Sequence, residues 1–114
     1  MSKDYKKITT DISSSVAKLS KSLPEVMNAF NGLMKFSTAE GGALEPKTKE
    51  LIALALGIAA HCDGCIGFHV QKLVKLGVTK EEFNELLGMA VYMGGGPSLM
   101  YASEALMAYE QFTS

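Results

Sequence analysis

The sequence lacks the features that mark several large classes of protein. Its 11 basic residues nearly balance 12 acidic ones, so there is no basic excess of the kind that binds nucleic acid or anionic membranes. No apolar run approaches the roughly 20 residues that cross a bilayer. The first residues, MSKDYKKITTDISSS, contain no apolar segment typical of a secretion signal. We therefore expect a cytoplasmic protein that binds neither nucleic acid nor a membrane.

Length and composition are typical of one folded domain. The chain has 114 residues, which favours a single domain spanning 1–114. Apolar residues make up 47% of the chain and charged residues 20%, a balance that supports a core and argues against disorder.

Cysteine and histidine are scarce, yet they are concentrated in one segment. Both cysteines and both histidines lie within nine consecutive residues, as His61, Cys62, Cys65 and His69. Structural disulfides are rare in the reducing cytoplasm, where a Cys-x-x-Cys pair usually indicates metal binding or redox chemistry.

The apolar spacing predicts an all-α fold of about six helices and no strand. Apolar residues recur every three or four positions, and prolines and glycines mark the helix ends. The expected helices cover 3–20, from Pro24 to a loop at 37–43, from Pro46 to Ala60, from about Cys62 to Leu76, from the capping box at 79–82 to the glycines at 94–96, and from Pro97 onward.

Two of these helices carry specific expectations of burial. The second should bury one face, composed of Val26, Met27, Phe30, Leu33 and Met34. The third contains the run from Leu51 to Ala60, which is apolar on all sides. Such a helix should be central and covered all round.

The Cys-x-x-Cys pair at the start of the fourth helix has the spacing of a redox centre. A thiol reacts as its thiolate, which the unpaired N–H groups of a helix N-terminus stabilise. Helical positions three apart are neighbours, so Cys62 and Cys65 can form a disulfide with little backbone motion. His69, four residues after Cys65, can exchange a proton with a thiol. If the third and fourth helices form a hairpin, Glu50 can orient that imidazole as a Glu–His–Cys relay.

These residues resemble the signature of the alkyl hydroperoxidase D-like group within the carboxymuconolactone decarboxylase superfamily. The spacing of Glu50, Cys62, Cys65 and His69 is that of the group throughout. The resemblance implies an all-α bundle with a central helical hairpin, assembly into trimers or hexamers, and peroxiredoxin-type, thiol-dependent reduction of peroxides. It also implies that a lipoyl group or a thioredoxin-like protein re-reduces the disulfide, and it implies no metal or other cofactor. One departure is Gly64, because strong peroxidases of the group often have histidine between the cysteines.

The role of each cysteine follows from two arguments that disagree. Exposure at the helix end favours Cys62 as the peroxide-reactive thiol, whereas proximity to His69 favours Cys65. We favour Cys65 as reactive and Cys62 as resolving. We expect His61 to be a C-terminal residue of the third helix, stabilised by the helix dipole, and Asp63 to be the N-cap of the fourth.

Other functions remain as alternatives to the peroxidase. The disulfide could act as a redox sensor or in disulfide exchange with little turnover. A lactone decarboxylase is less favoured, because the decarboxylases that the chain resembles lack the cysteine pair. His61, Cys62, Cys65 and His69 also form a nominal Cys₂His₂ set. However, four ligands at one helix start can hardly surround a zinc ion, and we expect no metal.

Overall fold

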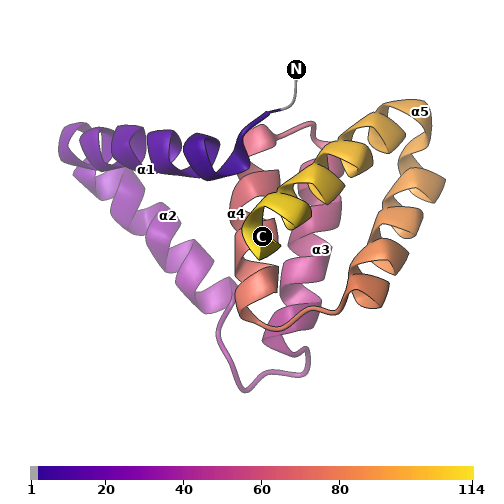
Figure 1. The fold of residues 1–114 in the computed structure, drawn as a ribbon. Helices are drawn as coiled ribbons and strands as arrows, with labels where there is room; N and C mark the ends of the chain where they lie inside the picture. The colour runs from indigo at the N-terminus through magenta and orange to yellow at the C-terminus, as the bar shows by residue number, and fades with distance from the viewer. Residues whose placement is uncertain (1–2) are drawn as a thin grey trace.

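The computed structural model describes residues 3–114 and folds them into helices without a strand (Figure 1). This confirms the all-α expectation. The helices are α1 (Tyr5–Ser22), α2 (Pro24–Ser37), α3 (Pro46–Ala59), α4 (Asp63–Lys75) and α5 (Lys80–Thr113). Among these described helices, none is long and apolar enough to cross a membrane.

The body of the molecule is formed by α3, α4 and α5, which pack against one another. In Figure 1, α3 and α4 lie side by side as a hairpin, and the last half of α5 crosses in front of them. The start of α1 packs on α4 and inserts Tyr5 into the core. The largest fully buried side chains are Tyr5, Leu54, Ile58, Ile66, Val70, Leu73 and Phe83.

Local signals in the sequence set most helix ends. Pro24 and Pro46 each occupy the first turn of a helix, where the missing N–H has no partner to lose. Thr79 and Glu82 form the expected capping box at the start of α5. Gly77 follows α4 with a positive φ of 78°, the left-handed conformation that glycine adopts without strain. These four expectations are confirmed.

The structure has five helices where about six were expected, and the difference lies at the glycines. The expected break occurs at Gly95, with φ 71° and ψ −155°, but α5 resumes at once beyond it. Pro97 lies at the start of the second half, where its lack of an N–H costs no hydrogen bond. The two expected helices are therefore the two halves of one kinked element.

The expected buried face of α2 is not buried, which corrects the sequence interpretation. No residue of α2 is buried, and Val26, Phe30 and Leu33 are 60%, 56% and 64% exposed. Met34 is also exposed, and Met27 is only partly buried. The reason is that, among the described helices, α1 is the one that packs on α2, and no helix of the body covers its apolar face (Figure 1).

The expectation that α3 is covered on every side is also wrong for the chain alone. Its buried residues, Glu50, Leu54, Gly57 and Ile58, form one stripe at helical spacing. That stripe faces α4 and α5, which are the only helices packed on α3. On the other side, Ile52 is 47% exposed and Leu56 66% exposed.

Candidate active site

The α3–α4 hairpin brings together Glu50 and His69. The Glu50 carboxylate is 2.8 Å from Nδ1 of His69, and the glutamate is only 6% exposed. The His69 side chain is 32% exposed, so the pair has one buried member and one that solvent can reach. The contact expected from a hairpin is therefore present.

This contact selects one ring nitrogen of His69 for chemistry. A carboxylate accepts hydrogen bonds, so it favours the tautomer in which Nδ1–H donates to Glu50. Nε2 is then the nitrogen left to accept a proton. The spacing of Cys65 and His69 places the sulfur and the imidazole one turn apart on the same face of α4.

Cys62 and Cys65 form a disulfide at the N-terminus of α4. Their Cα atoms are 5.2 Å apart, and no free cysteine remains in the chain. Cys62 is the N-cap residue of α4, and its sulfur accepts a hydrogen bond from the Cys65 N–H at 3.1 Å. The same N–H stabilises negative charge on the Cys62 sulfur when the disulfide opens.

The N-cap assignment corrects the expectation for Asp63. Cys62 has extended backbone angles, φ −104° and ψ 99°, and Asp63 is already the first helical residue. Because an N-cap residue is non-helical, the cap must be the cysteine. Asp63 instead places a carboxylate in the first turn of α4, between the two sulfurs in sequence.

A glycine allows α3 to approach the disulfide closely. A Cβ built on Gly57 would lie 2.9 Å from the Cβ of Cys65, closer than packed carbon atoms approach. The sequence interpretation treated Gly57 only as part of an apolar run. The available signal was the presence of glycine, the poorest helix former after proline, in the middle of a helix.

On the α5 side of the disulfide, His61 stacks on Tyr101. The ring centroids are 4.5 Å apart and the planes differ by 5°. His61 was expected as a C-terminal residue of the third helix, but α3 ends at Ala59 and His61 lies beyond its C-cap, Ala60. Its φ of 56° lies in the left-handed region that non-glycine residues seldom adopt. This stacking joins the turn before the disulfide to the second half of α5.

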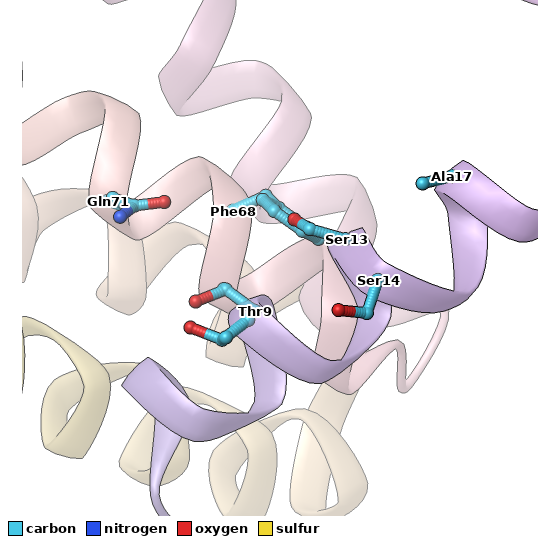
Figure 2. Close-up of a pocket in the computed structure, with 7 residues that line it drawn as sticks. Thr9, Ser13, Ser14, Ala17, Phe68 and Gln71 are labelled. Carbon is cyan, nitrogen blue, oxygen red and sulfur yellow. The ribbon is translucent and has the colours of Figure 1, made fainter.

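Two hollows differ in their relation to these residues. A cavity of about 260 Å³ is lined by Glu50 and His69 together with Ser37, Thr38, Lys49, Ile52, Ala53 and Leu56. A larger open groove of about 460 Å³ lies between α1 and α4 and is lined by Thr9, Thr10, Ser13, Ser14, Ala17, Phe68 and Gln71 (Figure 2). None of the four motif residues lines that groove. We place the candidate site at the smaller cavity because it alone reaches the Glu50–His69 pair.

Residues 3–114 contain no group of three or more His, Cys, Asp or Glu side chains arranged to hold a metal ion. The four residues of the nominal Cys₂His₂ set each contact another partner. The sulfurs are bonded to each other, His69 contacts Glu50, and His61 stacks on Tyr101.

Comparison with known proteins gives a consistent result. The model of the carboxymuconolactone decarboxylase family matches residues 24–108. An uncharacterized protein of Cupriavidus necator is 39% identical over 96% of both chains, and one of Haemophilus influenzae is 35% identical over 93% of both. A crystal structure of a carboxymuconolactone decarboxylase family protein from Legionella pneumophila superimposes with a TM-score of 0.93. The two sequences are 58% identical, and the superposition covers 96% of this chain and 97% of the Legionella chain.

Proposed function

Because the chain belongs to the carboxymuconolactone decarboxylase family, we propose that it is an alkyl hydroperoxidase D-like, thiol-dependent peroxidase. The observation that carries the proposal is the Glu50–His69 contact of 2.8 Å, with His69 one helical turn after Cys65, which forms a disulfide with Cys62 at the N-terminus of the same helix. A redox pair needs a proton carrier, and this arrangement supplies one within a single helical turn.

The first half of the proposed cycle uses Cys65 and His69. His69 Nε2 accepts the Cys65 proton, and Glu50 stabilises the resulting imidazolium through Nδ1. The Cys65 thiolate attacks one oxygen of the peroxide, the O–O bond breaks, and the leaving alkoxide takes the proton from His69. The products are an alcohol and a sulfenic acid on Cys65.

The second half uses Cys62 and an external dithiol. The Cys62 thiol gives up its proton and its sulfur attacks the sulfur of the Cys65 sulfenic acid; the S–O bond breaks, the disulfide forms, and the leaving hydroxide takes that proton as water. A dithiol, which we propose to be a lipoyl group or a thioredoxin-like protein, then exchanges with the disulfide and leaves as its own disulfide. If it attacks Cys65, Cys62 leaves as a thiolate that the Cys65 N–H stabilises. This cycle requires a reducing compartment, so the proposal retains the cytoplasm.

The experiment mixes reduced protein with an organic hydroperoxide and excess dihydrolipoamide and follows peroxide loss. We expect sustained turnover that Cys65→Ser abolishes. His69→Ala and Glu50→Gln should each slow it by about 10²–10⁴-fold, the usual contribution of a general base. Glu45→Gln, which removes an exposed carboxylate from the start of the same helix, is the control and should have no effect.

Other outcomes identify the rival functions. A single stoichiometric oxidation without turnover would replace the peroxidase with a redox sensor. A lactone-decarboxylating activity that survives alkylation of both thiols would show a cysteine-independent enzyme.

We also propose that the protein works as a homo-oligomer, a trimer or a hexamer as the family resemblance implies. Sixteen large apolar side chains remain exposed within residues 3–114, including the apolar face of α2. Monomeric proteins seldom leave so much apolar surface uncovered, and a second copy of the chain is the simplest cover. Ile52 and Leu56 extend this exposed surface to the rim of the site cavity.

A further inference from the structure

Lys3 lies at the N-terminus, yet its position is determined by contacts with distant parts of the chain. Its backbone carbonyl accepts a hydrogen bond from Gln111 at 2.6 Å, and the Gln111 side-chain oxygen accepts the Tyr5 N–H at 2.7 Å. Terminal residues are usually poorly ordered unless tied down. Gln111 of α5 supplies that tie.

The Lys3 ammonium bridges α4 and α5. It donates to Asp63 at 2.9 Å and also forms an ion pair with Glu104, which accepts a hydrogen bond from the buried Tyr5 hydroxyl. The pKa of Lys3 is raised well above its usual value, first by Glu104 and then by Asp63. The ammonium is therefore charged at neutral pH.

The Lys3 ammonium also lies over the ring of Tyr101, which contacts His61, the residue just before Cys62. Lys3 Nζ is 5.4 Å from the centroid of Tyr101, the ring on which His61 stacks. Tyr101 of α5 therefore holds His61 on one side of Cys62, and Lys3 holds Asp63 on the other side.

Asp63 creates an electrostatic problem that Lys3 can solve. A carboxylate in the first turn of a helix stabilises the helix, because it complements the positive end of the dipole. However, this carboxylate lies between the two sulfurs in sequence, and a like charge disfavours a thiolate. Lys3 is a cation within hydrogen-bond distance of Asp63. Its charge offsets that of Asp63 while leaving the helix stabilisation in place.

We propose that Lys3 is a positioning residue of the redox centre: by neutralising Asp63, it allows the reduced cysteine pair to form its thiolate at neutral pH. Other titratable groups lie on this segment or contact it through their partners: His61, which stacks on Tyr101; His69, which pairs with Glu50; and Tyr5 and Glu104 on the Lys3 side. In the part of the chain described, Lys3 is the only lysine that forms an ion pair with a residue of the Cys-x-x-Cys segment. The inference rests on the proposed function only in requiring that a thiolate be the reactive form.

The test measures the rate of iodoacetamide alkylation of the reduced protein against pH. In Lys3→Met we expect the pH midpoint to rise by about half to one unit, which means about threefold to tenfold slower alkylation at neutral pH. Lys47→Met is the matched control, because Lys47 pairs with Glu82 at the same 2.9 Å and similar exposure but far from the cysteines in sequence. It should leave the midpoint unchanged, and Lys3→Arg should retain it as well.

A rescue separates charge neutralisation from a merely structural role. If Lys3 acts through Asp63, adding Asp63→Asn to Lys3→Met should restore the wild-type midpoint, and Asp63→Asn alone should lower it. An unchanged midpoint in Lys3→Met, or a double variant as slow as Lys3→Met, would overturn the proposal. Asp63→Asn alone keeps the test decisive if Lys3→Met fails to fold. Alkylation needs no peroxide turnover, so this result stands apart from that of the peroxidase assay.

Discussion

Helices α2 and α3 have similar local sequence features, but one is exposed and the other packs in the core. Each has 14 residues, each begins with proline in its first turn, and neither has a side-chain hydrogen bond at its N-cap. Yet α3 buries four residues, whereas α2 buries none. The comparison shows that local signals suffice to form a helix but do not determine what covers its apolar face.

The two helices also differ in what they can contribute to the protein. Because one face of α3 packs against α4 and α5, it holds a buried Glu50 at hydrogen-bond distance from His69. A carboxylate on a helix like α2 would be solvated and would have no fixed partner. In turn, the apolar face of α2 is free to pack against a second copy of the chain.

The largest effect should come from placing charge on that face. Val26→Glu with Phe30→Glu buries two carboxylates if α2 lies in a subunit interface, which should abolish assembly. Sedimentation velocity at micromolar concentration measures the oligomeric state of the variant. Asn28→Glu with Asn31→Glu adds the same charge on the opposite side of α2 and should leave the assembly intact. A wild-type protein that sediments as a monomer would refute the oligomer itself.

A matched pair of leucines tests the comparison through stability. Leu54 of α3 is fully buried, and Leu54→Ala should lower the free energy of unfolding by about 2–5 kcal/mol. Leu33 of α2 is 64% exposed, and Leu33→Ala should cost at most about 0.5 kcal/mol in the dilute monomer. Urea denaturation gives both values. If α2 is covered in the oligomer, the cost of Leu33→Ala will grow with protein concentration, whereas equal costs at high dilution would contradict the structure.

A pair of glycines should give smaller effects of opposite sign. In Gly57→Ala the new methyl group meets Cys65, and overpacking of this kind costs about 1–3 kcal/mol. In Gly32→Ala nothing lies within 4 Å, so the better helix propensity of alanine should stabilise α2 by about 0.5–1 kcal/mol. Thermal unfolding of the two variants checks the signs. Stabilisation by Gly57→Ala would mean that α3 and α4 are not in close contact at Cys65.

Much of the secondary structure could be predicted because its causes are local. Pro24, Pro46 and Gly77 act within one turn, and the Thr79–Glu82 capping box spans three residues. The Glu50–His69 contact was also predictable, because two helices joined by a short turn pack as a hairpin. Their catalytic roles, and that of each cysteine, remain the proposal tested above.

The expectations that failed depended on distant contacts or on details of backbone angle. Apolar periodicity identified the face of α2 but gave no information on whether another element reaches it. The expected N-cap of α4, Asp63, and the observed one, Cys62, are neighbours in sequence, and only their backbone angles decide between them. The anchoring of Lys3 by Gln111 joins residues 108 positions apart, and no local pattern indicates it.

By itself, the sequence determined where most of the helices begin and end. It also determined that two cysteines and a histidine lie at helical spacing, with Glu50 on the helix before them. These properties follow from backbone sterics and hydrogen bonding within a turn or two. Only the tertiary structure decided which apolar stripe is buried, how little solvent reaches Glu50 in its contact with His69, and that Lys3 pairs with Asp63 of the Cys-x-x-Cys segment. Burial and ion pairing act between segments remote in sequence, so they depend on how the helices pack.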